Sequence, residues 1–254
     1  QINAGQGIEK YYTPEECFTF ETTTDETTGE QIGTITAYDE TKVGCTTDVV
    51  IPYEIGGESV TQIGTNAFKE KGLTSVEFPR SVTTIGVGSF RLNPTIEKII
   101  FKDGLVSLKR GAFYADSSSP IEMGKLSFVI FPESLTRIEN NAFTHNSLKQ
   151  VIIPDSVTKL MVGVFKGNRI ENYKIGIGVT SLYSTIFSDN EIKEVIIPDH
   201  IISVLGSFSN NPIEKIIIGK GLTTIGTLSF ANNQISPEFV NGRLPYVDNY
   251  LKEV

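Results

Sequence analysis

The sequence predicts a strand-rich solenoid of the α/β type, with a parallel β-sheet on one face, short turns, 3₁₀ or helical pieces opposite, and a cap at each end. Two observations lead to this fold class. Eight phenylalanines recur at spacings of 22, 23, 30, 22, 22, 21 and 22 residues, and the segments between them share one apolar pattern. The eight are Phe68, Phe90, Phe113, Phe143, Phe165, Phe187, Phe208 and Phe230. One such repeat cannot bury its own apolar face, so neighbouring repeats must stack.

Each repeat begins with a segment that reads as a short strand. In Leu73-x-x-Val76-x-Phe78 the last two apolar positions are two residues apart, which is the period of a strand, and Leu148-x-x-Val151-x-Ile153 repeats the pattern. β-Branched residues dominate these positions, as expected for strands. A proline often follows, and it ends the strand because it cannot donate to a parallel ladder. These segments therefore predict the parallel sheet.

A second apolar segment and a polar position complete the repeat. Segments such as Val157-x-x-Leu160 supply a second inward wall, and the phenylalanine plugs the remaining side of the coil. Three residues after most of these phenylalanines stands a short polar residue, whose side chain can satisfy the backbone groups of a tight turn. This series comprises Asn93, Asp116, Asn146, Asn168, Asn190, Asn211 and Asn233. Because the residue recurs in nearly every coil, we expect a structural ladder and not a ligand site.

The chain divides into three regions by this pattern. Residues 1–48 lack the repeat and read as a β-hairpin that covers the first coil, since open ladder edges recruit other chains. Residues 49–236 hold eight repeats of about 22 residues, with a loop-like insertion at 117–124. Residues 237–254 break the pattern and are expected to cap the other end.

Composition excludes several function classes. With 22 basic and 30 acidic residues the net charge is −8, which provides no electrostatic attraction to nucleic acid or to anionic membranes. No uncharged run approaches the length that spans a bilayer, so membrane insertion is not expected. The two histidines, His145 and His200, read as residues of surface turns, and no nucleophile with its base, metal-ligand cluster or phosphate-binding loop is evident. We therefore expect no catalytic residues, no cofactor and no metal.

The complete motif resembles the bacterial BspA-like leucine-rich repeat. The match is closest in LKQVIIPDSVTKLMVGVF, residues 148–165, and the resemblance covers roughly residues 48–235. Lys102, Gly176 and Gly219 depart from the motif at the position of the proline. The resemblance implies a leucine-rich-repeat solenoid and a bacterial protein that is secreted or lies on the cell surface, some of its relatives being adhesins. It implies no catalytic residue. The expected function is a non-enzymatic scaffold that binds protein or glycan, and the alternative is a structural spacer that displays other domains.

Two cysteines, Cys17 and Cys45, fall in the N-terminal region. The extracellular setting implied by the resemblance favours a disulfide, which would close a loop of about 28 residues. Two buried free thiols are the alternative interpretation.

A stripe of aliphatic residues is expected on the outer face of the predicted sheet. It occupies the position between the two inward residues of each strand, where Glu77 and Lys174 are the exceptions. With one neighbouring aromatic residue, the candidate binding face consists of Ile100, Phe128, Ile130, Ile152, Ile196 and Ile217. Such a stripe can mark a surface for a partner or for self-association. Alternatively, the stacked β-branched residues stabilise the ladder by contact with their neighbours.

Overall fold

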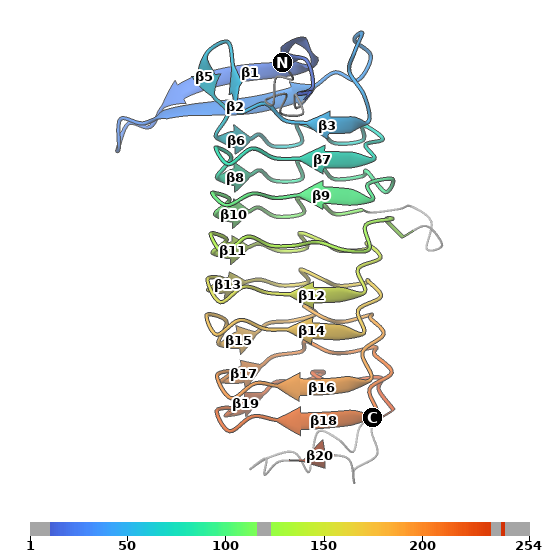
Figure 1. The fold of residues 1–254 in the computed structure, drawn as a ribbon. Coiled ribbons are helices and arrows are strands. Elements are labelled where there is room, and N and C mark those ends of the chain that lie inside the picture. The colour runs from blue at the N-terminus through green and yellow to red at the C-terminus, as the bar shows by residue number, and fades with distance from the viewer. Residues whose placement is uncertain (1–10, 116–122, 235–239, 242–254) are drawn as a thin grey trace, which may run out of the picture.

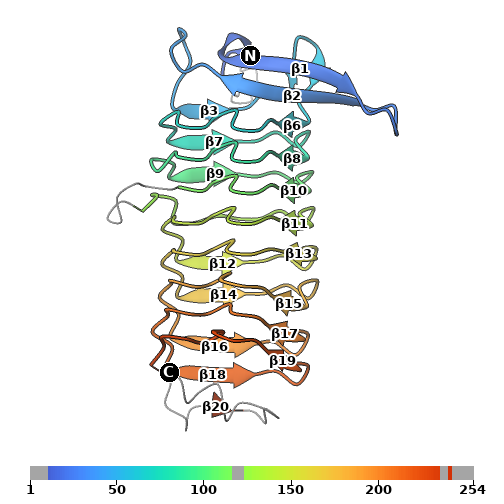
Figure 2. The same ribbon diagram turned by 180° about the vertical axis from the view of Figure 1, so that it is seen from behind.

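A computed structural model shows a straight stack of coils with one ladder of strands on each of two opposite sides (Figures 1 and 2). The structure describes residues 11–115, 123–234 and 240–241. We name the two sides the long-strand face and the short-strand face. The predicted strand-rich leucine-rich-repeat solenoid with a parallel sheet is confirmed. A 3₁₀ turn, η1 (Glu15–Cys17), is the sole helical element of the described residues.

The long-strand face contains the strands that the sequence predicts. They are β3 (Asp48–Val50), β7 (Ser75–Glu77), β9 (Lys98–Ile100), β12 (Gln150–Ile152), β14 (Asn172–Lys174), β16 (Glu194–Ile197), β18 (Lys215–Ile218) and β20 (Val240–Asn241). They pair in parallel in three separate groups: β3-β7-β9, β12-β14 and β16-β18-β20. The long-strand face is therefore interrupted twice, after β9 and after β14.

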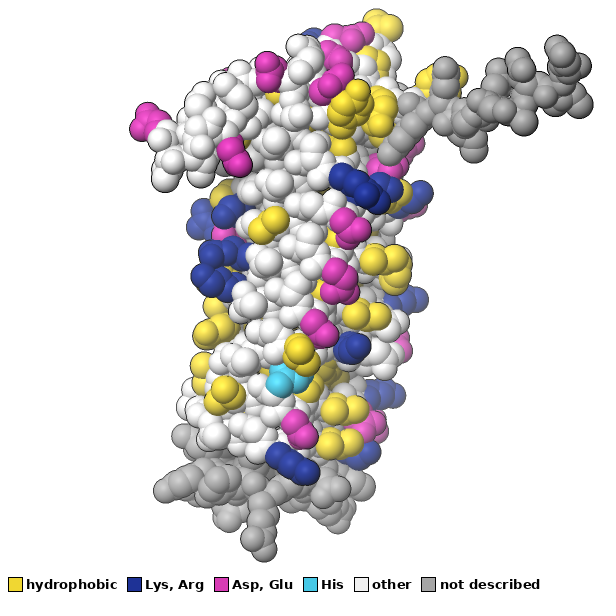
Figure 3. Space-filling model, turned by 60° about the vertical axis from the view of Figure 1, so that its left-hand side comes forward, with side chains coloured by type: hydrophobic (Ala, Val, Ile, Leu, Met, Phe, Trp, Pro, Cys, Tyr) yellow, Lys and Arg dark blue, Asp and Glu magenta, His cyan; other side chains and the backbone are white. Residues whose placement is uncertain are grey.

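The short-strand face is formed by the second apolar segment of each repeat, in two parallel ladders that are separated between residues 160 and 181. Its strands are β6 (Gln62–Ile63), β8 (Thr84–Ile85), β10 (Ser107–Leu108), β11 (Arg137–Ile138), β13 (Lys159–Leu160), β15 (Ser181–Leu182), β17 (Ser203–Val204) and β19 (Thr224–Ile225). Turns and these two-residue strands occupy the side where the sequence also allowed 3₁₀ or helical pieces. Figure 3 shows this side, on which hydrophobic side chains are scattered except for a group towards the N-terminal end.

One strand expected from the sequence does not form. Residues 126–131 match the repeat pattern, but they are not a strand, and Phe128 and Ile130 lie outside any ladder. The chain enters residues 126–131 directly from the insertion. At this point the Lys125 N–H donates a hydrogen bond to the Pro94 carbonyl oxygen (2.8 Å). Residues 116–122, which comprise Asp116 and six of the eight residues of the insertion at 117–124, lie outside the described residues.

The N-terminal hairpin closes one end of the stack. Strands β1 (Phe18–Thr24) and β2 (Gln31–Tyr38) pair antiparallel, and β2 pairs in parallel with β6, so the hairpin covers the edge of the short-strand face. A smaller antiparallel pair, β4 (Glu54–Ile55) and β5 (Glu58–Ser59), lies beside it. Of the expected C-terminal cap, 237–254, the described part is β20, which pairs with β18.

A disulfide ties the chain before this hairpin to the loop that follows it. It joins Cys17 and Cys45, whose Cα atoms are 5.7 Å apart, and Cys17 is fully buried. The bond decides between the two interpretations of the cysteines.

The phenylalanines form one continuous column through the core. All eight are buried, and each ring stacks on the next with centroids 4.7–6.0 Å apart and planes within 19°. Tyr38 of the hairpin stacks on Phe68 at 5.1 Å and thereby extends the column into the cap. Its hydroxyl donates to the Thr46 carbonyl oxygen (2.6 Å), and burial raises the pKa of Tyr38. The cap and the repeats thus share one core.

The asparagine series joins coils to the coil before them at five positions, whereas Asn233 bonds within its own coil. The Asn168 amide nitrogen donates to the carbonyl oxygens of Phe143 (2.9 Å) and Phe165 (3.0 Å), and its oxygen accepts from the Leu148 N–H (3.1 Å). Asn190 and Asn211 repeat these three bonds one and two coils further on. The expected structural ladder therefore exists, and its amides are buried inside the turns.

The left-handed backbone positions lie beside the asparagines of the ladder and not on them. Positive φ angles recur two residues before each phenylalanine, and two residues after all of them except Phe113. His145, at φ 60°, is one of these residues, as are Asp189 and Asn210. This geometry turns the chain sharply on both sides of the plug, which accounts for the abundance of Gly and Asn there.

Asn168→Ala should lower the free energy of unfolding by about 3 kcal/mol or more. The reason is that two buried carbonyl groups and one N–H lose their hydrogen-bond partner. Urea denaturation would measure it, with Asn172→Ala as the control because Asn172 is exposed. An equal effect of the two substitutions would contradict the role assigned to the ladder.

Removal of the disulfide should destabilise the cap by about 3–4 kcal/mol, because it releases a closed loop of 28 residues in the unfolded chain. Thermal unfolding with and without reductant would show the shift. Cys17→Ser/Cys45→Ser, which has no bond to reduce, should be insensitive to reductant. A melting curve of the unmodified protein that reductant does not change would count against the estimate.

Candidate functional site

The second interruption of the long-strand face, between β14 and β16, is the candidate functional site. The two strands belong to different groups and stand further apart than β12 and β14 do (Figure 1). A groove of about 610 Å³ lies there, within the size range of ligand sites in proteins. It is lined by Glu171, Asn172, Tyr173, Glu191, Lys193, Glu194, Ile196 and Pro212.

Tyr173 causes this interruption. It occupies an inward position at which the neighbouring repeats have a β-branched residue, as in Val151 and Val195. Its ring packs on the phenylalanine column, 4.9 Å from Phe187 and 5.7 Å from Phe208 between centroids. A ring of this size in place of a valine forces the two coils apart on this face.

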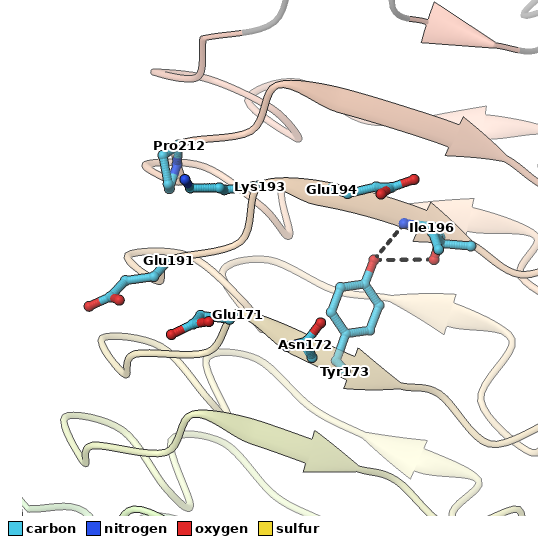
Figure 4. Close-up of a pocket in the computed structure, with 8 residues that line it drawn as sticks. All are labelled: Glu171, Asn172, Tyr173, Glu191, Lys193, Glu194, Ile196 and Pro212. Carbon is cyan, nitrogen blue, oxygen red and sulfur yellow. Dashed lines mark hydrogen bonds between the residues drawn. The ribbon is translucent and has the colours of Figure 1, made fainter.

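The hydroxyl group of Tyr173 replaces the ladder that the ring prevents. It donates to the Ile196 carbonyl oxygen (3.1 Å) and accepts from the Ile196 N–H (3.0 Å), as Figure 4 shows. Elsewhere on this face a main-chain N–H fills the role, since Ile153 donates to the Lys174 carbonyl oxygen (2.9 Å). In a continuous ladder the Ile175 N–H would donate to the Ile196 carbonyl oxygen. Here that oxygen accepts from the Tyr173 hydroxyl instead. The Tyr173 side chain thus both separates β14 from β16 and bonds to the main chain of β16.

The tyrosine hydroxyl remains neutral over the physiological range. Burial raises the pKa of Tyr173 well above the ordinary value of 10.0. Because the folded-state pKa is raised, the stability that the neutral group contributes is fully present below pH 10 and is lost as the pH rises above the unfolded-state value.

The charged groups of the groove lie on its rim. Glu171, Glu191 and Glu194 are exposed carboxylates, and Lys193 is the cation among the eight lining residues. Glu194 forms an ion pair with Lys215 of the next strand (2.7 Å). Glu171 and Glu191 form no ion pair with any described residue. The groove is therefore acidic, with an apolar wall at Ile196 and Pro212.

The structure distributes the six residues of the predicted binding face over separate places. Ile152 pairs with Lys174, and Ile196 pairs with Ile217, so the second gap separates them. Phe128 and Ile130 are exposed but lie off the ladder, with 58% and 68% of their surface accessible. Ile100 and Ile217 are only half-buried positions within paired strands. The six residues stay a predicted binding face, now divided among three groups of paired strands and the segment 126–131.

Sequence reasoning identified one residue of the groove, Ile196. It missed Tyr173 because a tyrosine satisfies the same apolar pattern as valine. The available signal was the single aromatic residue in a column that otherwise holds Val and Ile.

Residues that could support chemistry are dispersed. His145 lies in a turn, with its ring 5.6 Å from that of Tyr114, and His200 lies in the turn after β16. Within residues 11–115, 123–234 and 240–241, no group of three or more His, Cys, Asp or Glu side chains could hold a metal ion. The same described ranges contain no helix of the length and apolarity needed to cross a bilayer.

The repeats match a known protein family. The family model for the BspA type leucine-rich repeat region matches residues 45–125 and 121–236. This chain belongs to the BspA-type leucine-rich repeat family. No curated protein matches it.

The chain is similar to several solved structures, of which the T. pallidum protein shares the fold. A T. pallidum leucine-rich repeat protein is 21% identical with a TM-score of 0.56, over 87% of this chain and 92% of that one. A Bacteroides ovatus leucine-rich repeat protein is 18% identical with a TM-score of 0.45, over 90% and 82% of the two chains. The pneumococcal vaccine antigen PcpA is 16% identical with a TM-score of 0.41, over 94% of each chain. At 21% identity the likeness to the T. pallidum protein concerns the fold alone.

Tyr173→Phe should lower the free energy of unfolding by roughly 1–3 kcal/mol, because it keeps the ring but leaves the N–H and C=O of Ile196 unpaired. Chemical denaturation would test this. The matched control is Tyr183→Phe, which removes an exposed hydroxyl and should change stability by less than about 0.5 kcal/mol. Equal stability of the Tyr173→Phe variant and the unmodified protein would refute the bridging role.

Proposed function

We propose that this protein is a non-enzymatic extracellular scaffold, secreted or on a bacterial cell surface, that binds a protein or glycan through its long-strand face. The observation that carries the proposal is the groove between β14 and β16, at the second of the two interruptions of this face. Concave sites with a few polar groups are the common form of ligand site.

The surroundings of the groove support a binding role. Ile152 and Ile196 each expose 51% of their surface on either side of the gap, and Phe128 and Ile130 expose more. Exposed aliphatic and aromatic groups are typical of interaction surfaces. A structural spacer, the alternative function, would require the stacked core but not this opening.

The location in an oxidising compartment is supported by the cap. The Cys17–Cys45 disulfide links the chain on the two sides of the hairpin, and such bonds persist in secreted and surface proteins but are rare in the cytosol. Membership of the BspA-type family agrees with this setting. An adhesin-like role is the form of binding that we propose.

An array of glycans and matrix proteins probed with the whole chain tests the proposal. We expect at least one ligand whose binding is lost in Ile130→Lys/Ile152→Lys, because two charges would disrupt an apolar contact on the long-strand face. The matched control is Val106→Lys/Ile202→Lys, which adds the same charge at exposed residues of the short-strand side. No ligand on the array would favour the spacer, and equal loss in both variants would show that the long-strand face is not the site.

A further inference from the structure

The acidic groove beside Tyr173 has the features of a receptor for one kind of side chain. We propose that it holds a cationic side chain, arginine or lysine, presented by an extended segment of a protein partner. The inference rests on the proposed function and specifies the ligand chemistry of the same face.

The groove carries an excess of negative charge. Glu171 and Glu191 come from successive coils, linked through the bond from the Glu191 N–H to the Ile170 carbonyl oxygen (3.1 Å). Figure 4 shows their side chains extending to the same side of the chain. Neither forms an ion pair with a described residue, whereas Glu194 is paired with Lys215. A cation between the two carboxylates would relieve their mutual repulsion.

The groove combines an apolar wall with a charged rim. Ile196 and Pro212 line the groove together with these carboxylates. Arginine and lysine bury an alkyl stem along apolar surface and keep the charged head at a polar rim. Arginine can also bond two carboxylate groups through its planar fork of N–H donors. The groove therefore matches both parts of such a side chain.

The unpaired strand edges beside the groove indicate the shape of the partner. Because β14 and β16 do not pair, their facing main-chain edges lack ladder partners except where the Tyr173 hydroxyl bonds to Ile196. Open strand edges take up extended peptides. A sugar is disfavoured, since the aromatic ring among the eight lining residues, Tyr173, is engaged in packing on Phe187 and Phe208.

Lys193 provides an internal check on the proposal. Its side chain extends towards Pro212 on the same side as the two free carboxylates (Figure 4). An ammonium group at this place repels an incoming cation and partly neutralises the groove. Removal of its charge should therefore strengthen binding, opposite in sign to removal of a carboxylate.

Fluorescence anisotropy with a capped, labelled peptide of alternating Thr and Arg tests the inference on the whole chain. Glu171→Gln/Glu191→Gln should weaken binding by about 10-fold or more, because charge-assisted bonds are lost. Lys193→Gln should strengthen it several-fold. The same peptide with citrulline in place of Arg should bind about 10-fold more weakly to the unmodified protein.

The control variant Glu26→Gln/Glu133→Gln removes two exposed carboxylates away from the groove and should bind the peptide as the unmodified protein does. Equal weakening in both double variants would mean general attraction to an acidic chain and would overturn the inference. So would equal affinity for the Arg and citrulline peptides, or no binding of either. Array ligands lost in Ile130→Lys/Ile152→Lys but indifferent to Glu171→Gln/Glu191→Gln would leave the proposed function standing and remove this ligand chemistry.

Discussion

The contact between each coil and the coil before it is the interaction on which the whole structure depends. A buried phenylalanine stacks on its predecessor, and a buried asparagine bonds to the carbonyl groups of both phenylalanines. The ring supplies apolar burial, and the amide satisfies backbone groups that a sharp turn would otherwise leave unpaired. Every coil must place both groups in register, which explains why the spacing stays so close to 22 residues.

This constraint leaves the strand faces free to vary. Because the core column and the asparagine ladder hold the coils together, the long-strand face can be interrupted without separation of the stack. Tyr173 uses this freedom: its ring joins the column, and its hydroxyl bonds to the next strand in place of a main-chain group. The groove is therefore a local variation of one repeat, and it requires no added loop or domain.

The repeating part of the fold could be predicted from the sequence because it is periodic. The phenylalanine series, the strand segments and the asparagine ladder each recur many times, so one irregular copy does not hide them. Single events were not predictable in this way. Residues 126–131 match the strand pattern, yet they form no strand, although the carbonyl oxygens of Leu126 and Ser127 accept hydrogen bonds from the next coil. The place where the Tyr173 hydroxyl bonds depends on the distance between two coils, which no pattern of residue types contains.

The same distinction applies to the candidate site. Ile196 was expected on the outer face because strand alternation is local, and it does line the groove. The other lining residues gather there because Tyr173 opens the gap, so their proximity follows from packing across coils. The short-strand face was expected as an apolar wall, but its ladder depends on alignment between coils more than 20 residues apart in sequence.

Amide hydrogen exchange resolved to single residues tests most directly whether Tyr173 opens the long-strand face. The Ile153 N–H donates to the Lys174 carbonyl oxygen. The N–H of Ile175, the equivalent residue one repeat further on, lies at the gap between β14 and β16. The account predicts strong protection of the Ile153 amide and much faster exchange of the Ile175 amide, although both side chains are buried. Equal, strong protection of the two amides would mean a continuous ladder between β14 and β16, and it would contradict the account.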